Sequence, residues 1–305
     1  MTIMTRWLAF ICLCLSLQVQ ASSYAQTRYP IVLVPGVLGF AQVFGIDYFY
    51  GIPSDLQANG ATVFETSSSA LNSTLARGEE LLGQVQTILA ITGAQKVNLI
   101  GHSHGGVAAR YVAAIIPTQV ASVTTIGSPN TGTPVADALL GLTQTAPALA
   151  SLAVPIANAF STLLDTFAGT QYSENAIAEM QSMSTAGQAA FNAQYPAGMP
   201  SSPCGQGAAY ANGQHYYSWG GTSVFTNFFD PTDYLFSVTS LAFSGQANDG
   251  LTGQCSSHFG TVLRDDYPWN HGDEINQFLG LRGWFTPDPV AVFREQANRL
   301  KNTGL

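Results

Sequence analysis

Short apolar runs recur along the first half of the chain, separated by longer stretches of mixed polarity. Residues 29–34 (YPIVLV), 96–100 (KVNLI) and 120–126 are rich in β-branched side chains. Runs of this length and composition predict buried strands. Residues 62–64 predict one more strand.

The stretches between these runs have a helical pattern. Residues 74–91 place leucine, isoleucine and valine on one face and end before Gly93, and residues 107–116 show a similar spacing. Strands that alternate with helices predict an α/β fold, in which a mainly parallel sheet carries helices on both faces.

Residues 133–169 interrupt this alternation. No charged side chain occurs between residues 138 and 164, so a membrane-spanning helix is one interpretation. Pro147, Pro155 and several interspersed polar residues argue against a single span. We therefore predict a cap, or lid, of short amphipathic helices inserted into the domain.

The second half of the chain is less regular. Residues 209–243 have the pattern of strands and aromatic-rich loops, and residues 238–243 in particular resemble a strand. Residues 273–279 predict a short helix, and residues 290–300 predict a closing one. Because no repeat or long linker is visible, we expect residues 22–305 to form a single domain.

The N-terminus has the pattern of an export signal. Arg6 precedes an apolar run at residues 7–17, and residues 19–21 (VQA) provide a small-residue cleavage site, with a second at residues 23–25. The apolar run is too short to span a membrane comfortably. We predict that residues 1–21 are a signal peptide and that the mature protein is secreted.

Cleavage of that signal would remove two of the four cysteines and leave Cys204 and Cys255. In an oxidising compartment two cysteines most simply form a disulfide, although two buried free thiols are the alternative.

The composition excludes some partners. Hydrophobic residues make up 46% and charged residues 9% of the chain, as expected of a protein that handles apolar substrates or of an adhesive secreted protein. The net charge of −8 leaves no basic patch for nucleic acid and disfavours anionic membranes.

The pentapeptide Gly101-His102-Ser103-His104-Gly105 lies where a predicted strand meets a predicted helix. This is the context of a nucleophile elbow, a sharp turn that exposes a serine hydroxyl. Ser103 is therefore the candidate nucleophile, and it needs a base to accept its proton.

Three histidines follow the elbow. His215 lies in a predicted strand and His258 before an apolar run, whereas His271 lies in a loop and is the preferred base. For the acid that orients it, Asp249 is modestly favoured over Asp230 and Asp233.

Attack of a serine on a carbonyl carbon places negative charge on the carbonyl oxygen, which is then called an oxyanion. Two backbone N–H groups are needed to stabilise it. His104, which follows the nucleophile, supplies one. Val37, in the loop after the first strand, supplies the other.

With these segments assembled, the chain resembles the bacterial family I true lipases, the Pseudomonas-type foldase-dependent group. The likeness rests on YPIVLVPGVLGF, DYFYGIPSDL, KVNLIGHSHGG, ANDGLTGQCSSH and NHGDEINQFLGL. It implies an α/β-hydrolase fold, triacylglycerol hydrolysis at oil–water interfaces, a mobile lid, one structural Ca²⁺ and a membrane-anchored foldase during maturation.

Residue by residue, the resemblance implies the triad Ser103, Asp249 and His271 and the oxyanion donors Val37 and His104. It implies a Cys204–Cys255 bridge. It also implies calcium ligands: the carboxylates of Asp230 and Asp273, the side-chain oxygen of Gln277 and the carbonyl of Leu281. From the residues alone, helix capping and solvation are the preferred roles of Asp273 and Gln277.

One position departs from the family pattern, because Pro35 stands where these lipases usually have histidine. Proline donates no N–H, so any hydrogen bond by which that histidine holds the oxyanion loop is missing. We expect a modest change in activity or substrate range.

The sequence thus favours a secreted triacylglycerol lipase. A carboxylesterase or polyester hydrolase with the same triad is the alternative within the class, and a non-catalytic lipid-binding protein is the alternative outside it. The apolar segment at residues 138–164 favours the lipase, because small soluble esters need no apolar cap.

Overall fold

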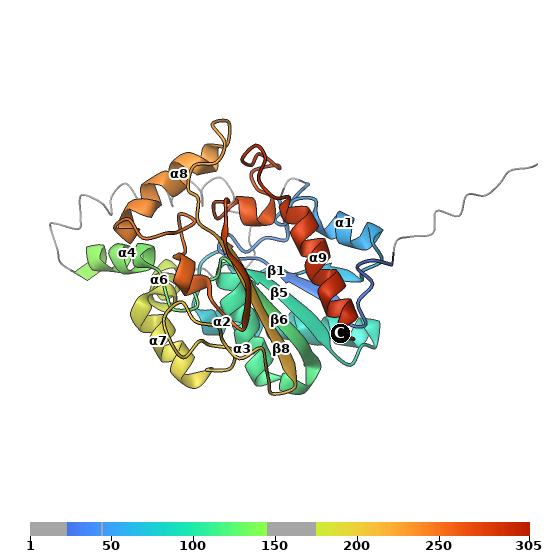
Figure 1. Cartoon of the computed structure of the whole chain (residues 1–305). Coiled ribbons are helices and arrows are strands. Elements are labelled where there is room, and N and C mark those ends of the chain that lie inside the picture. Colours follow the sequence, from blue (N-terminus) through green and yellow to red (C-terminus); the bar gives the residue numbers. More distant parts are fainter. Residues whose placement is uncertain (1–22, 44, 145–174) are drawn as a thin grey trace, which may run out of the picture.

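A seven-stranded sheet forms the centre of the molecule in the computed structural model, which describes residues 23–43, 45–144 and 175–305. Its strand order is β4-β1-β5-β6-β8-β7, with β9 paired to β8 (Figure 1). The strands that run parallel are β1 (Ile31–Val34), β4 (Val63–Glu65), β5 (Val97–His102), β6 (Val120–Ile126), β8 (Gln214–Gly221) and β9 (Thr261–Tyr267).

Two shorter antiparallel pairings accompany the parallel strands. β7 (Tyr210–Ala211) pairs with the beginning of β8. β2 (Gln42–Val43) and β3 (Ile46–Asp47) form a separate ribbon in the segment that follows β1.

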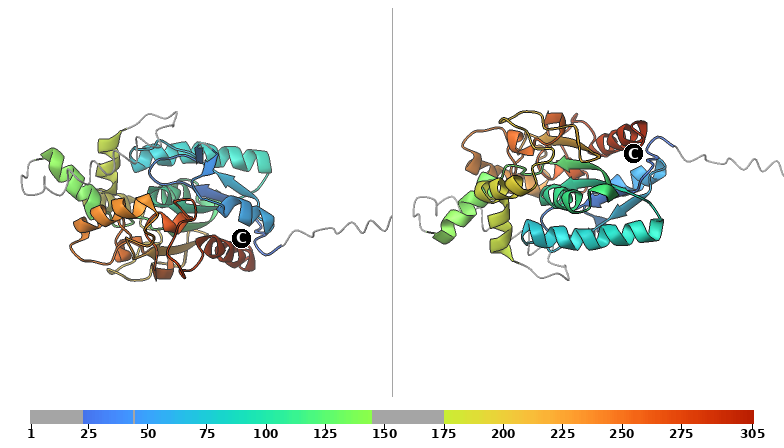
Figure 2. Two further views of the ribbon diagram at one scale, coloured as in Figure 1. Left: turned by 90° about the horizontal axis from the view of Figure 1, so that it is seen from above. Right: turned by 90° about the horizontal axis from the view of Figure 1, so that it is seen from below.

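Helices cover both faces of the sheet, as Figure 2 shows from above and below. α2 (Thr74–Thr92) and α3 (His104–Ile115) lie on one face, and α1 (Ile52–Ala58) and α9 (Pro289–Asn302) on the other.

Alternation along the strands explains the two layers. On β1, Val32 and Val34 belong to the core beneath α2 and α3, whereas Ile31 and Leu33 pack in the core that contains Phe293 of α9. Successive side chains on a strand point to opposite faces, and a sheet buried on both sides therefore needs an unbroken apolar run.

Further helices lie beside and above the sheet. α4 (Pro134–Gln144), α6 (Ala176–Met183) and α7 (Thr185–Gln194) pack together, and α8 (Pro231–Thr239) lies at the upper edge in Figure 1. Short 3-10 turns complete the chain at Pro117–Gln119, Ser240–Phe243, Gln254–Ser257 and Asp273–Ile275. Within the described residues, no helix combines the length and apolarity needed to cross a membrane.

Most of the predicted elements are confirmed, but two are wrong. The segment 238–243, predicted as a strand, is the end of α8 and a 3-10 turn. Asp230 caps α8 by accepting the Thr232 N–H, and Pro231 occupies the first turn, so the helix start prevails over the strand-like pattern. The predicted helix 273–279 is only the turn Asp273–Ile275, because Asn276 adopts a left-handed conformation (φ 62°).

Two predictions fall wholly or largely outside the described residues. The signal peptide at residues 1–21 lies outside them altogether. Of the cap at residues 133–169, the structure describes residues 133–144, in which α4 is helical as predicted.

Cys204 and Cys255 form a disulfide across 51 residues of sequence, which excludes the free-thiol alternative. The bridge joins the loop before β7 to the turn that follows Asp249.

We predict that replacing both cysteines by alanine lowers the free energy of unfolding by about 4 kcal/mol, because the bridge restricts the unfolded chain. Urea denaturation of the double variant against the oxidised parent measures this. The parent treated with a reductant should match the variant. A loss below about 1 kcal/mol would contradict the chain-entropy account.

Candidate active site

Ser103 occupies a sharp turn between β5 and α3. Its backbone dihedrals (φ 55°, ψ −132°) are unusual for a residue with a side chain, and its N–H donates to the Ile126 carbonyl at 2.8 Å. The turn brings backbone into close contact. A Cβ at Gly101 would lie 2.5 Å from the Gly105 carbonyl carbon, and one at Gly105 would lie 2.3 Å from the Val34 carbonyl oxygen. Glycine at both positions is therefore required, as a nucleophile elbow predicts.

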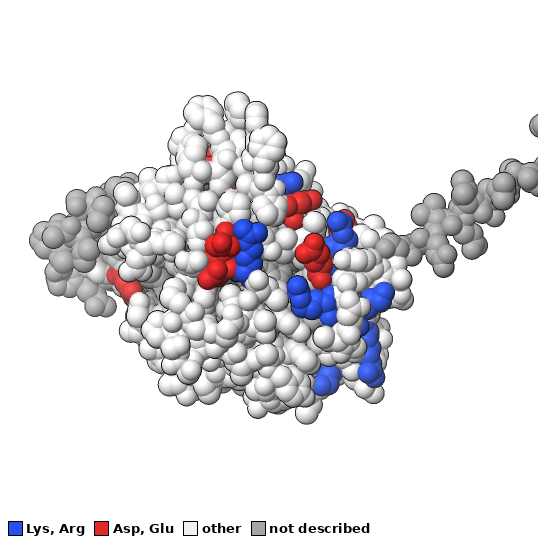
Figure 3. Space-filling model, in the orientation of Figure 1, with Lys and Arg blue, Asp and Glu red and all other residues white. Residues whose placement is uncertain are grey.

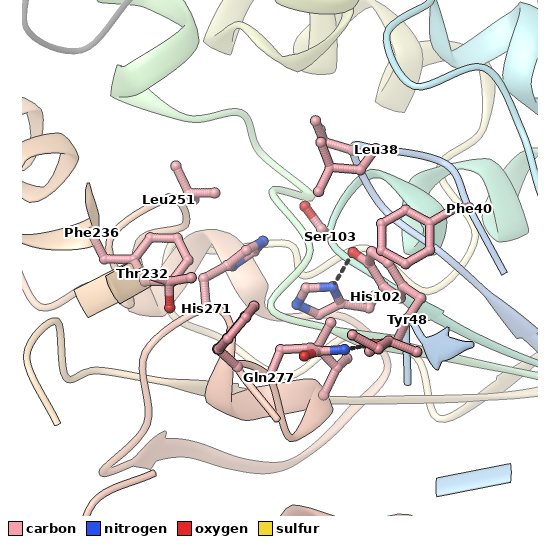
Figure 4. Close-up of a pocket in the computed structure, with 15 residues that line it drawn as sticks. Leu38, Phe40, Tyr48, His102, Ser103, Thr232, Phe236, Leu251, His271 and Gln277 are labelled. Carbon is pink, nitrogen blue, oxygen red and sulfur yellow. Dashed lines mark hydrogen bonds between the residues drawn. The ribbon is translucent and has the colours of Figure 1, made fainter. Parts of the chain in front are cut away.

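His271 and Asp249 form a buried pair. The Nδ1 of His271 lies 2.8 Å from the Asp249 carboxylate, and the His271 N–H donates to the Asp249 carbonyl at 2.9 Å. Asp249 also accepts the N–H groups of Leu251 and Thr252, which fix its side chain. His271 and Ser103 line the same cavity, and Figure 4 shows the imidazole directed toward the serine.

The alternative bases and acids have other partners. His258 lies between the Gly205 carbonyl and the carboxylate of Asp265, and His215 is beside tyrosine rings on β7 and β8. Neither histidine lines the cavity. Asp230 caps α8, and Asp233 accepts the Asn227 N–H and the Asn270 side-chain amide.

The two candidate oxyanion donors lie on either side of Ser103. His104 begins α3, where the first N–H groups of a helix have no partner within it. Val37 lines the cavities on both sides of the serine, and the next N–H, that of Leu38, already donates to the Ala70 carbonyl.

Arg77 of α2 holds the loop that carries Val37. Its buried guanidinium donates to the carbonyls of Pro35 and Gly36 at 3.0 and 2.6 Å, and to that of Ser69. The Pro35 carbonyl is therefore one of the groups through which Arg77 holds this loop, and no side chain at position 35 takes part in these hydrogen bonds. Arg77 was not predicted from the sequence; the available signal was a cation on the otherwise uncharged buried face of α2.

A second anchor comes from Tyr48. Its hydroxyl accepts the Gly36 N–H at 3.0 Å and lies 2.8 Å from Nδ1 of His102. The hydroxyl can donate its own proton to His102 Nδ1; in that arrangement the His102 proton is on Nε2, which lies 3.3 Å from Glu274. Burial raises the pKa of the Tyr48 phenol, which keeps it protonated.

Glu274 connects this network to the candidate base. Its carboxyl group accepts the Gly221 N–H at 2.6 Å and lies 4.0 Å from His271 Nδ1. Burial first, and then the nearby Asp249, raises the pKa of Glu274 well above its ordinary value. Burial lowers the pKa of His102. Both shifts favour a neutral His102–Glu274 pair beneath the site.

His104 is fixed from the other side. Its Nδ1 lies 2.7 Å from Glu179 of α6, and its Nε2 lies 2.8 Å from the Thr74 hydroxyl. Burial lowers the pKa of His104, and Glu179 opposes that shift. The residue that offers an oxyanion donor is thus tied to both α2 and α6.

Two cavities meet at Ser103. The larger extends over apolar side chains that include Leu38, Phe40 and Phe236 (Figure 4). The smaller lies toward Val135 and other apolar residues of α4 and α6. Apolar groups attached to both sides of a bond at Ser103 would therefore be accommodated.

The residues predicted to bind calcium are only partly brought together. Burial raises the pKa of Asp273 to about 7, and the neighbouring Asp233 and Asp230 contribute. One oxygen of Asp273 is buried without a hydrogen-bond partner among the described residues. The Gln277 side chain is engaged elsewhere, with Nε2 donating to the Asp47 carbonyl at 2.6 Å and Oε1 accepting the Leu279 N–H at 3.0 Å. A bound cation such as Ca²⁺ would neutralise the negative charge of these carboxylates.

A second group of possible metal ligands belongs to the polar network beside the candidate base and consists of His102, His271 and Glu274.

We predict that Tyr48→Phe lowers kcat for a soluble ester about tenfold with little change in KM, because one hydrogen bond that positions the Val37 loop is lost. Steady-state kinetics measure this. Tyr216→Phe is the matched control, since that buried hydroxyl bonds to Gln214 outside the cavity. Equal kcat values for the two variants would contradict the role of Tyr48.

Comparison with known proteins agrees with this geometry. The model of the alpha/beta hydrolase fold family matches residues 29–275. The triacylglycerol lipase of Vibrio cholerae is 47% identical over 283 residues, which cover 92% of this chain and 90% of the relative. Those of Burkholderia plantarii and Pseudomonas fragi are 43% and 41% identical, covering 94% and 92% of this chain and 90% and 98% of the relatives.

Solved structures show the same fold at low identity. The mature Bacillus licheniformis lipase BlEst2 is 18% identical, with a TM-score of 0.60 over 90% of this chain and 92% of that structure. Staphylococcus hyicus lipase is 17% identical, with a TM-score of 0.59 over 93% of this chain and 98% of its own. The chain therefore belongs to the α/β-hydrolase family and, within it, to the bacterial proteins named triacylglycerol lipase.

Proposed function

We propose that the protein is a secreted triacylglycerol lipase that uses Ser103, His271 and Asp249 as its catalytic triad. The supporting observation is the position of Ser103, on a strained turn where two apolar cavities meet and opposite the buried His271–Asp249 pair. The family membership and the named relatives point to the same chemistry.

In this mechanism the Ser103 hydroxyl attacks the ester carbonyl while Nε2 of His271 accepts its proton. Asp249 holds Nδ1 of the imidazole and stabilises the imidazolium. The negative charge that develops on the carbonyl oxygen is stabilised by the N–H groups of Val37 and His104. The tetrahedral intermediate expels the alcohol, which takes the proton from His271, and leaves an acyl group on Ser103. Water then hydrolyses this acyl-enzyme by the same steps.

The apolar linings of the two cavities favour long acyl chains over small soluble esters. A carboxylesterase or polyester hydrolase with the same triad would use the same mechanism, so the distinction lies in the substrate.

We expect faster hydrolysis of emulsified long-chain triacylglycerol than of a soluble short-chain ester. Ser103→Ala should lower both rates at least about 10⁴-fold and abolish labelling by a fluorophosphonate. Titration of released acid measures the rates, and circular dichroism checks the fold. Ser201→Ala, at an exposed serine outside the cavity, is the control. Preference for the soluble ester would indicate an esterase, and a folded parent without labelling would indicate a binding protein.

We further infer a structural Ca²⁺ held by Asp230 and Asp273, with Leu281 and Gln277 as the additional ligands that the resemblance suggests. The support is the buried carboxylate pair and the partnerless oxygen of Asp273. Calcium prefers carboxylate and carbonyl oxygens. Asp273 lies two residues after His271, so the ion would stabilise the loop that carries the base.

We predict that a chelator lowers the melting temperature by about 5–10 °C, as expected if bound calcium contributes about 2–3 kcal/mol. Calorimetry with and without chelator measures this. The Asp273→Asn variant should have the melting temperature of the chelator-treated parent, both with and without chelator. Asp266→Asn, which alters an exposed carboxylate, should keep the response. A parent that is insensitive to the chelator would count against the ion.

Secretion is part of the proposal and is supported by the disulfide, since such bridges persist in oxidising compartments. The foldase stays a prediction from the resemblance. The recovery of active enzyme on refolding with and without a foldase would test it.

A further inference from the structure

Two neighbouring loops expose several large aromatic side chains. Residues 225–229, before α8, expose Phe225, Phe228 and Phe229, with Phe228 at 69%. Residues 282–286 expose Trp284 at 79% and leave Phe285 fully in solvent. These five residues and Tyr234 of α8, six in all, are called the aromatic face below. Several large apolar side chains exposed on neighbouring loops indicate an interaction site in a soluble protein.

The loops of the aromatic face are held against each other. The side-chain amide of Asn227 donates to the Arg282 carbonyl at 2.9 Å, and Gly283 packs against Thr226. The arrangement is therefore built by the fold.

Rings on the first loop are also fixed to α8. Phe225 and Phe228 lie 5.3 and 6.4 Å from the Tyr234 ring, and the Tyr234 hydroxyl donates to the Phe228 carbonyl at 3.2 Å. These contacts orient the rings without burying them.

The backbone of Phe285 gives a second reason to infer a partner. Its φ of 67° lies in the left-handed region, which disfavours bulky residues and which glycine adopts easily. An aromatic residue at this position therefore combines backbone strain with full exposure. Neither property stabilises the isolated fold, so contact with a partner is the role that accounts for them.

The aromatic face and the cavity at Ser103 are built on shared elements. Thr232 and Phe236, on the same helix as Tyr234, line that cavity, and Phe278 lines it from the segment that leads to Trp284. In Figure 1, α8 and both loops lie at the upper edge of the molecule. A surface that contacts the face would thus lie against the same helix that contributes Thr232 and Phe236 to the cavity.

The charges indicate the chemistry of that surface. Residues 225–229 and 283–286 contain no charged side chain, and Arg282 pairs with Asp288 at 3.4 Å. Figure 3 shows the upper part of the molecule largely without charged groups, which gather in a band below it. The chain as a whole has a net charge of −8. A neutral or zwitterionic lipid surface fits this face, whereas an anionic membrane does not.

We propose that the aromatic face seats the protein on a neutral lipid surface, with Phe228, Trp284 and Phe285 inserted among the lipids. Aromatic side chains favour the boundary between lipid and water. This inference deepens the lipase function proposed above and rests on it for the identity of the lipid.

The test measures binding of the full-length mature protein with Ser103→Ala to vesicles of ether-linked phosphatidylcholine, which contains no cleavable acyl ester. Among the described tryptophans, Trp284 is exposed while Trp219 and Trp269 are buried. A change in tryptophan fluorescence on vesicle binding therefore reports insertion of Trp284. We expect a blue-shifted emission and protection from acrylamide. In a co-flotation assay, the partition coefficient between vesicles and buffer should be about tenfold lower for Phe228→Ser and for the double variant Trp284→Ser/Phe285→Ser.

A matched control comes from the opposite edge of the sheet. Ile91, at the end of α2, and Tyr210, in β7, are exposed apolar residues that lie near the beginnings of the strands. Ile91→Ser/Tyr210→Ser should partition like the parent. With Ser103 restored, every variant should hydrolyse a soluble short-chain ester at the parental rate, whereas only the aromatic-face variants should lose activity on emulsified oil.

Two results would overturn the inference. One is equal partitioning of the aromatic-face variants and the parent. The other is a lipid-free dimer that these substitutions dissociate without changing vesicle binding, which would assign the face to self-association. Failure of the proposed function gives a different pattern: the parent would bind vesicles through the face but hydrolyse no ester.

Discussion

The close approach of β5 and α3 at Ser103 is the constraint on which the site depends. The chain reverses so sharply there that backbone atoms occupy the space of side chains at Gly101 and Gly105. This turn needs a fully buried strand on one side and a helix packed on the sheet on the other, and the two apolar cores supply both. The sheet therefore determines where Ser103 lies, and the loops at the same edge bring the remaining groups to it.

Buried polar side chains that lie close to one another surround those groups. Tyr48, His102 and Glu274 connect the loop after β1 to the segment that carries His271. His104 and Glu179 connect the start of α3 to α6. Buried polar groups are costly unless they are paired, so each contact favours one arrangement of the loops that it joins. Under the proposed mechanism, the same contacts determine the geometry of catalysis.

The sequence predicted the parts of this structure that depend on local pattern. The strands at residues 29–34 and 96–100 and the turn at Ser103 were visible because apolar runs and glycine spacing have direct local causes. The residues proposed as the triad lie in loops and turns at one end of the sheet, although the strand predicted at residues 238–243, before Asp249, is the end of a helix and a 3-10 turn.

Long-range partners were beyond the reach of the sequence. Arg77 bonds to carbonyls that lie up to 42 positions away, and His104 bonds to a carboxylate 75 positions away. No periodicity reports on such pairs, because they depend on how the elements pack. The Gln277 side chain shows the same limit, since it contacts backbone 230 positions away and not the carboxylates.

Arg77 also has a thermodynamic consequence. Its guanidinium fixes the carbonyls of the loop after β1 before any ester is present, so the dipoles of that loop are oriented when the chain folds. Dipoles that are already oriented need no reorganisation as charge develops on a substrate. Under the proposed mechanism, part of the free energy that lowers the activation barrier would thus be contained in the folding of the chain.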